Sequence, residues 1–287
     1  MPPSSAGPTT TILELPSGIR VGVTQQGGTR APAVVCLPGW GGSQYLFRHN
    51  IPALASAGFR AIAIDLKGHG VSDKPLDTDD YTLDGMVAHV LEVLDALHLE
   101  KASLIGQSMA GPIAAQISLT AFERVERLVL LAPVGYGPIR PVSIARVLAP
   151  LGVARHLPAL ATRWMFDLVV KSMYGDLIKP SERDIDEYFA PASDPNFVRA
   201  LHRLIHHFDW SSFDDGRLRA LRVPLLVIRG DSDPIVPLSV LDRFRQDVPG
   251  LRVAKIPRAG HLLTEEAPEA VNRAIVDFLS APNLQPG

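Results

Sequence analysis

Short, uninterrupted apolar runs recur along this chain, and helix-like segments separate them. The runs are Ala33–Leu37, Ala61–Ile64, Ala102–Ile105, Leu128–Leu131 and Pro224–Ile228. Strands that are buried on both faces of a parallel sheet have this continuous apolar composition, and the connections between parallel strands commonly hold a helix. The pattern therefore predicts an α/β fold, with helices covering both faces of a mostly parallel sheet.

Three further segments complete the predicted sheet. Thr11–Leu15 and Ile19–Thr24 alternate between apolar and polar residues around a Pro-Ser-Gly turn, which predicts an antiparallel hairpin, and Leu251–Ile256 predicts a last strand. The sheet is thus expected to have eight strands. Helices are predicted at Tyr81–Leu97, Met109–Ala121, Leu238–Asp247 and Pro268–Leu279.

The alternation of strands and helices stops between Val134 and about Asp215. This segment has a helix-like pattern broken by seven prolines, which predicts a helical cap at 134–215 inserted into a core of 11–133 and 216–281. Trp164 and Phe166 lie in an apolar cluster of this segment and are candidate substrate-binding residues. A helical subdomain with its own core is the simpler alternative. Residues 1–10, rich in Pro, Ser and Thr, are predicted to be a flexible tail.

The composition excludes several classes of function. Of 287 residues, 46% are hydrophobic and 20% are charged, and the formal net charge is −2, so no overall positive field would attract nucleic acid or an anionic membrane. No apolar run reaches the roughly 18 residues that a membrane span needs. Cys36 is the one cysteine, so no intramolecular disulfide forms, and a buried position is expected for it. We expect a soluble, cytoplasmic protein; the sequence leaves a homo-oligomer open.

Ser108 stands where a predicted buried strand runs directly into a predicted helix. Gly106 and Ala110, two positions to either side, are small. This is the context of a nucleophile elbow, a strained turn that exposes a serine hydroxyl above the sheet and leaves no room for bulky neighbours. A serine at this position could instead be a helix cap. The strand before it and the helix after it favour the nucleophile.

Two later strands lead into residues that complete a catalytic set. The strand that ends at Ile228 is followed by Asp231 and Asp233, and the strand that ends at Ile256 is followed by His261. A serine, an aspartate and a histidine in this chain order can form a triad in which histidine is the general base and aspartate orients it.

These motifs resemble those of the α/β-hydrolase superfamily, from about Thr11 to Leu279. The matching segments are Gly106-Gln-Ser-Met-Ala110, which has alanine for the usual last glycine, Leu37-Pro-Gly-Trp-Gly-Gly42, which lacks the family's histidine, and Asp65-Leu-Lys-Gly-His-Gly-Val-Ser72. The resemblance implies an α/β-hydrolase fold. In the third segment Asp65 and His69 could be taken for a second acid-base pair, but a glycine-rich structural turn explains their spacing.

The resemblance also implies individual roles. Because the family's acid commonly stands fourth in a Gly-x-x-Asp run, Asp233 is selected over Asp231, which is then expected to cap the turn. The backbone amides of Trp40 and Met109 are the expected oxyanion donors, and the Trp40 side chain is a candidate substrate contact. The predicted site is thus Ser108, Asp233 and His261 with this oxyanion hole.

A serine hydrolase that cleaves a carboxylic ester or lactone of a small to medium, largely apolar substrate is the expected function, with no cofactor or metal. His206, His207 and Asp209 could be taken for metal ligands, but adjacent histidines point in different directions on a helix. A serine argues against haloalkane dehalogenases and most epoxide hydrolases, relatives that use aspartate at the elbow. Carbon–carbon bond hydrolysis, cofactor-free haloperoxidase or perhydrolase chemistry, and a slowly turning-over ligand receptor remain alternatives.

Overall fold

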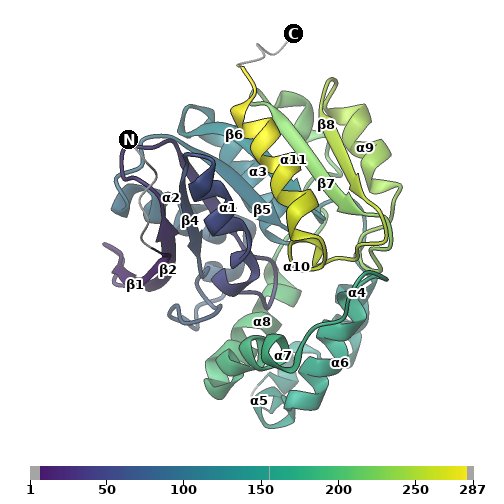
Figure 1. Cartoon of the computed structure of the whole chain (residues 1–287). Helices are drawn as coiled ribbons and strands as arrows, with labels where there is room; N and C mark the ends of the chain where they lie inside the picture. Colours follow the sequence, from purple (N-terminus) through teal and green to yellow (C-terminus); the bar gives the residue numbers. More distant parts are fainter. Residues whose placement is uncertain (1–6, 155, 283–287) are drawn as a thin grey trace.

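An eight-stranded sheet forms the centre of the structure, a computed structural model that describes residues 7–154 and 156–282 (Figure 1). The strand order is β1-β2-β4-β3-β5-β6-β7-β8. β1 pairs with β2 and β2 with β4 in antiparallel orientation, and the remaining neighbours are parallel. The predicted α/β fold with a mostly parallel sheet is confirmed.

The strands lie close to the predicted positions. Their bounds are β1 Thr9–Glu14, β2 Arg20–Gln26, β3 Ala33–Leu37, β4 Arg60–Ile64, β5 Ala102–Gln107, β6 Val125–Leu131, β7 Leu225–Gly230 and β8 Arg252–Ile256. Every residue of β3, β5 and β7 is buried, as expected for strands covered on both faces. Cys36 lies in β3 and is fully buried, as predicted.

Helices cover both faces of the sheet (Figure 1). α2 Leu83–Ala96, α3 Ala110–Thr120 and α9 Val240–Asp247 contribute to one apolar cluster, whereas α1 Asn50–Ser56 and α11 Pro268–Ser280 contribute to the other. The 3-10 helices η1 Gln44–Phe47, η2 Asp79–Tyr81 and η3 Phe122–Arg124 and the short helix α10 Leu263–Glu266 lie in the connections. These two apolar layers hold the strands, and therefore the loops at their ends, in place.

A group of helices separates β6 from β7 and lies beyond one end of the sheet (Figure 1). Their bounds are α4 Arg140–Leu148, η4 Leu151–Val153, α5 Leu157–Leu160, α6 Arg163–Met173, α7 Glu182–Phe189, η5 Ala190–Ser193 and α8 Pro195–His207, with η6 Arg217–Ala220 before β7. Their amphipathic faces pack on one another; Phe197 and Leu204 of α8 are fully buried.

The structure corrects two boundaries. The tail predicted at residues 1–10 is wrong for Thr9 and Thr10, because these residues pair with Gln25 and Thr24 as the start of β1; residues 1–6 lie outside the described part of the chain. α9 begins at Val240 rather than at Leu238, because the amide of Val240 closes a turn onto the carbonyl of Pro237. Within the residues described, no helix is long and apolar enough to span a bilayer.

Candidate active site

The three predicted triad residues follow three strands, β5, β7 and β8, of the parallel part of the sheet. Ser108 follows β5, Asp233 lies in the loop after β7, and His261 lies in the loop after β8. In a parallel sheet the carboxyl ends of the strands lie at one edge, which is where open α/β sheets bind their ligands. The fold therefore brings Ser108 together with His261, which lies 153 positions later in the chain, and with Asp233.

The turn at Ser108 is strained in the manner predicted for a nucleophile elbow. Its φ is +53°, in the left-handed region that L-residues rarely adopt. A Cβ on Gly106 would lie 2.4 Å from the carbonyl oxygen of Ala110, so only glycine permits this turn. The amide of Ser108 donates to the carbonyl of Leu131 at 2.9 Å, which ties the elbow to β6. Packing and hydrogen bonding thus hold the serine in its strained conformation.

Ser108, His261 and Asp233 form a continuous hydrogen-bonded chain. Oγ of Ser108 lies 2.9 Å from Nε2 of His261, and Nδ1 of His261 lies 3.0 Å from Oδ2 of Asp233. All three side chains are buried. With Nδ1 donating to the carboxylate, Nε2 has a free lone pair and can accept the proton of the serine hydroxyl.

Asp233, and not Asp231, contacts the imidazole. Its second oxygen, Oδ1, accepts from the amides of Ile235 and Val236 at 2.8 and 3.0 Å. Burial raises the pKa of Asp233, but the charge and hydrogen bond of His261, together with the two amides, outweigh it and leave this pKa below its usual value. Asp231 was expected to cap the turn, but the amides of the turn donate to Asp233, and Asp231 is exposed.

The loop after β3 lies against the elbow. A Cβ on Gly39 would come within 2.3 Å of Oε1 of Gln107 and 2.9 Å of Cβ of Ser108, so the absence of a side chain permits this close approach. Trp40 follows Gly39, and Met109 follows Ser108 and caps α3 at its N-terminus. The two predicted oxyanion donors therefore belong to segments that meet at the nucleophile.

Residues 32–268 match the model of a known family, described as the alpha/beta hydrolase fold. The chain belongs to the alpha/beta hydrolase fold family. It is 30% identical over 253 residues to the hydrolase YugF of Bacillus subtilis (strain 168), covering 86% of this chain and 89% of that protein. It is also 30% identical over 276 residues to the 2-hydroxy-6-oxononadienedioate/2-hydroxy-6-oxononatrienedioate hydrolase of Paraburkholderia phymatum, covering 93% of each chain.

A solved structure has the same fold over nearly the whole chain. The serine hydrolase of carbazole degradation called CarC superposes with a TM-score of 0.79 at 24% identity, covering 96% of this chain and 99% of that one. At this level of identity the similarity concerns the fold alone. The resemblance to the α/β-hydrolase superfamily, drawn above from the sequence motifs, is thus confirmed.

The candidate substrate contacts of this alpha/beta hydrolase lie in different environments. Trp40 is half-buried, and its indole N–H donates to the carbonyl of Leu201 in α8 at 3.0 Å. Phe166 packs between the rings of Phe189 and Phe197, with centroids 5.4 and 6.4 Å away. Trp164 is 66% exposed on α6. The structure therefore holds Trp40 and Phe166 in packed positions, whereas most of Trp164 contacts solvent.

The loop after β4 is held by the carboxylate of Asp65. This carboxylate accepts the amides of Gln44 and Val71 at 2.6 and 2.9 Å, and a Cβ on Gly70 would lie 2.2 Å from it. His69 is fully buried, and its Nδ1 faces the carbonyl of Lys67 at 3.2 Å. These contacts support the structural interpretation of this loop.

The histidines near the end of α8 bind backbone. His202 and His206 both hydrogen bond the carbonyl of Ala149, at 2.8 and 2.9 Å. Neither ring is directed at Asp209, whose carboxylate accepts the amide of Ser211 at 3.1 Å. In the part of the chain that the structure describes, no group of three His, Cys, Asp or Glu side chains is arranged to hold a metal ion.

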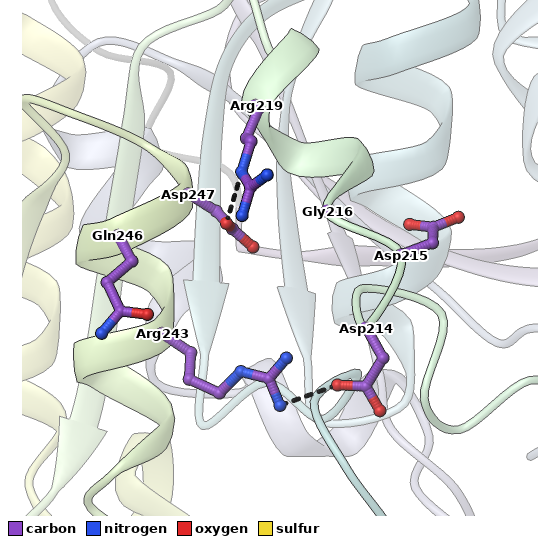
Figure 2. Close-up of a pocket in the computed structure, with 7 residues that line it drawn as sticks. All are labelled: Asp214, Asp215, Gly216, Arg219, Arg243, Gln246 and Asp247. Carbon is purple, nitrogen blue, oxygen red and sulfur yellow. Dashed lines mark hydrogen bonds and ion pairs between the residues drawn. The ribbon is translucent and has the colours of Figure 1, made fainter.

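A separate polar pocket lies between α9 and η6 (Figure 2). Its charged side chains form pairs: Arg243 contacts Asp214 at 2.8 Å, and Arg219 contacts Asp247 at 2.9 Å. These pairs neutralise the charges that would otherwise attract a ligand, and none of the triad residues lines this pocket.

Sequence reasoning missed two residues near the site. Glu265 and Glu266 stand just before the predicted helix at Pro268–Leu279, and both are buried, with 3% and 5% of their surface exposed. Adjacent buried glutamates are unusual and require partners. Because both glutamates follow His261 closely in the chain, their partners could be expected to lie near the loop that carries His261.

Proposed function

We propose that this protein hydrolyses a carboxylic ester or lactone of a small to medium, largely apolar substrate, with Ser108 as nucleophile. The observation that carries the proposal is the chain Ser108–His261–Asp233, with 2.9 and 3.0 Å between successive partners, at an elbow where Ser108 has φ +53°. A serine hydroxyl is a weak nucleophile until an adjacent base takes its proton. This arrangement supplies such a base and orients it.

Attack of Oγ of Ser108 on the substrate carbonyl forms a tetrahedral intermediate while Nε2 of His261 takes the hydroxyl proton. The negative charge that develops on the carbonyl oxygen is stabilised by the amides of Trp40 and Met109. The imidazolium then protonates the leaving alkoxide, and the carbon–oxygen bond breaks to leave an acyl-enzyme on Ser108. Water, deprotonated by His261, attacks this ester, releases the acid and regenerates the serine.

The identity of the nucleophile separates this chemistry from epoxide hydrolysis. Attack of a serine oxygen on an epoxide carbon would leave an alkyl ether on Ser108. Such an ether has no carbonyl for water to attack, so the enzyme would not turn over by this route. A substrate with a carbonyl, by contrast, gives an ester that the same histidine and oxyanion donors can hydrolyse.

We infer that residues 134–215 form a cap over this site. Two contacts support this role: the amide of His261 donates to the carbonyl of Met173 at 2.8 Å, and the indole of Trp40 donates to the carbonyl of Leu201 at 3.0 Å. The helical segment thus contacts the loops on both sides of Ser108. Phe166, in the aromatic cluster of α6, α7 and α8, is the best-supported apolar contact for the substrate from this segment.

Hydrolysis of a carbon–carbon bond is the second candidate. It is favoured by the 30% identity, over 93% of each chain, with the hydrolase of Paraburkholderia phymatum that is named for 2-hydroxy-6-oxo dienedioates. A dicarboxylate of this kind needs cationic partners. The buried guanidinium of Arg229, the nearest in sequence to Asp233, instead donates to the carbonyls of Gly230 and Val236, which places the ester first.

Steady-state hydrolysis of a nitrophenyl ester series, run beside a 2-hydroxy-6-oxo dienedioate, tests the proposal. We expect sustained turnover of the esters and labelling of Ser108 by a fluorophosphonate, located by mass spectrometry. A single stoichiometric burst would instead indicate a ligand receptor. Turnover of the dienedioate alone would favour the second candidate, and an unlabelled Ser108 in folded protein would refute both.

A further inference from the structure

The connection that follows α6 runs alongside the loop that carries His261. The amide of His261 donates to the carbonyl of Met173 at 2.8 Å, and the amide of Asp176 donates to the carbonyl of Arg258 at 2.8 Å. Two backbone hydrogen bonds therefore join the helical insertion to the segment that holds the proposed base. We call this contact, between 173–176 and 258–261, the seam.

Two glycines permit the seam to close. A Cβ on Gly175 would lie 2.5 Å from the carbonyl oxygen of Arg258 and 2.6 Å from the amide nitrogen of Gly260. A Cβ on Gly260 would lie 2.3 Å from the amide nitrogen of Gly175. These are distances to backbone atoms, which cannot rotate away. The two segments can approach this closely only because neither has a side chain here.

The carboxylate of Glu266 joins the two glycines. Its Oε1 accepts the amide of Gly260 at 2.8 Å, and its Oε2 accepts the amide of Gly175 at 2.9 Å. Burial raises the pKa of Glu266 in spite of these two bonds. One side chain thus connects the residue directly before His261 with the insertion.

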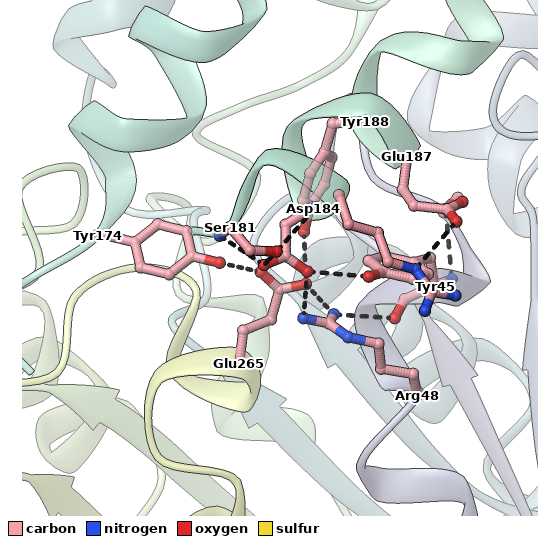
Figure 3. A network of polar contacts seen from close by, with 10 residues as sticks. Tyr45, Arg48, Tyr174, Ser181, Asp184, Glu187, Tyr188 and Glu265 are labelled. Carbon is pink, nitrogen blue, oxygen red and sulfur yellow. Dashed lines mark hydrogen bonds and ion pairs between the residues drawn. The ribbon is translucent and has the colours of Figure 1, made fainter. Parts of the chain in front are cut away.

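The neighbouring Glu265 anchors the same part of the insertion to the core (Figure 3). Its carboxylate accepts the hydroxyl of Tyr174, at the end of α6, and the hydroxyl of Tyr188 of α7, the second at 3.1 Å. It also forms an ion pair with Arg48, the residue after η1. Arg48 also contacts Asp184 of α7 at 2.8 Å. These contacts join α7 and the end of α6 to α10 and to the residue after η1, so both sides of the seam are held in place.

We propose that Glu266 is a positioning residue that, through the seam with Gly175, sets the place of the His261 backbone relative to Ser108. Asp233 orients the imidazole ring, but it does not hold the backbone from which the ring projects. That backbone is held on one side by the carbonyl of Met173, which accepts the amide of His261, and on the other by Nε2 of Gln107, which donates to the carbonyl of His261 at 3.3 Å. The inference rests on the proposed function, because it assigns the seam a role in placing the general base.

Two pairs of variants isolate the seam. Glu266→Gln keeps the side-chain shape but gives one of the two amides an NH2 group in place of an acceptor; Glu269→Gln makes the same change on an exposed residue of α11. Gly175→Ala inserts a Cβ against the backbone of the catalytic loop, whereas Gly152→Ala inserts one in the same insertion with no atom within 4 Å.

The readouts are the rate of fluorophosphonate labelling, kcat and KM on one ester, and the downfield proton NMR signal of Nδ1–H of His261. Since a displacement of 1 Å at a reacting group can cost about 100-fold, we expect Glu266→Gln and Gly175→Ala to lower the labelling rate and kcat by about 10-fold or more. KM should change less than kcat, and the NMR signal should shift or broaden. Glu269→Gln and Gly152→Ala should match the parent.

Rates are taken on folded protein, isolated by gel filtration and checked by circular dichroism. Should Glu266→Gln fail to fold, Glu266→Asp replaces it, because the charge is kept while the carboxylate is withdrawn by one methylene. Parental labelling rates and an unchanged NMR signal in Gly175→Ala and in the folded Glu266 variant would overturn the inference. Failure of the parent itself to label at Ser108 would overturn the proposed function instead, so the two failures are distinguishable.

Discussion

Asp233→Asn tests how the structure selects the tautomer of His261. Oδ1 of Asp233 accepts the amides of Ile235 and Val236 at 2.8 and 3.0 Å, and Oδ2 accepts Nδ1–H of His261 at 3.0 Å. An asparagine here must direct its oxygen at the two amides, because its NH2 would otherwise face two donors. The NH2 then faces Nδ1, which must become an acceptor. The imidazole proton is therefore transferred to Nε2, where it meets the hydroxyl of Ser108.

An imidazole protonated at Nε2 cannot accept the proton of Ser108. In serine proteases the same exchange lowers kcat about 10⁴-fold, which corresponds to about 5.5 kcal/mol in the activation barrier. We expect a loss of this size at neutral pH. The free energy of unfolding should change by only about 1 kcal/mol, because asparagine keeps the acceptor for both amides.

The assay is kcat on a saturating nitrophenyl ester, with urea unfolding of the same preparations. Asp231→Asn is the matched control, since Asp231 lies in the same loop, carries the same charge and is exposed. It should change the free energy of unfolding by no more than about 0.5 kcal/mol and leave kcat near the parental value. A collapse of kcat with Asp231→Asn, together with activity in Asp233→Asn, would refute the reasoning.

Three other predictions follow from burial and geometry. Ser108→Ala should abolish ester turnover and fluorophosphonate labelling while circular dichroism stays unchanged, because one hydroxyl is lost from a turn that is otherwise intact; parental labelling would exclude Ser108 as the nucleophile. Burial lowers the pKa of His69 to about 4 and that of His89 to about 3. In the unfolded state both histidines take up a proton near pH 6.5, so below that pH the unfolded state binds more protons than the folded state. The free energy of unfolding should therefore fall by about 4 kcal/mol between pH 7 and pH 5. Urea titrations that give the same free energy of unfolding at both pH values would contradict this. Trp164→Ala should change the free energy of unfolding by less than about 0.5 kcal/mol, because Trp164 is 66% exposed. Phe166→Ala should lower it by about 2 kcal/mol, because the ring contacts of Phe166 are lost. Thermal unfolding of both variants measures the difference, and an equal loss would show that Trp164 is packed in solution.

Local sequence predicts the strands and the elbow of this protein well, because their physical causes are local. The continuous apolar composition of Ala33–Leu37 follows from burial on both faces, and β3 has these bounds. At the elbow, Gly106 is required by a contact with Ala110, which is only four positions away in the chain. The chain order of Ser108 and His261 could be read because parallel strands end at the same edge of a sheet.

The seam could not be predicted, because its cause lies in contacts between distant segments. Nothing near Gly175 in the sequence shows that its amide will meet the carboxylate of Glu266, which lies at the end of α10, after β8 in the chain. The two aspartates of the acid loop show the same limit. A loop carboxylate is a good turn cap wherever it stands, and only the folded loop shows that Asp233 caps the turn with one oxygen and contacts His261 with the other.

Three buried carboxylates surround the loop of His261, and their partners determine which of them acts on the ring. Glu265 accepts from Arg48 and two tyrosine hydroxyls, and Glu266 accepts from two backbone amides. The hydrogen-bond donors that these two carboxylates need are therefore groups other than His261. Asp233 has one oxygen satisfied by amides and one left for Nδ1 of His261. Burial raises the pKa of Glu266, and the negative charge of Asp233 raises it further. A proton therefore binds more readily to Glu266 than to Asp233, and the carboxylate that must stay ionised to stabilise the imidazolium is the one that faces it.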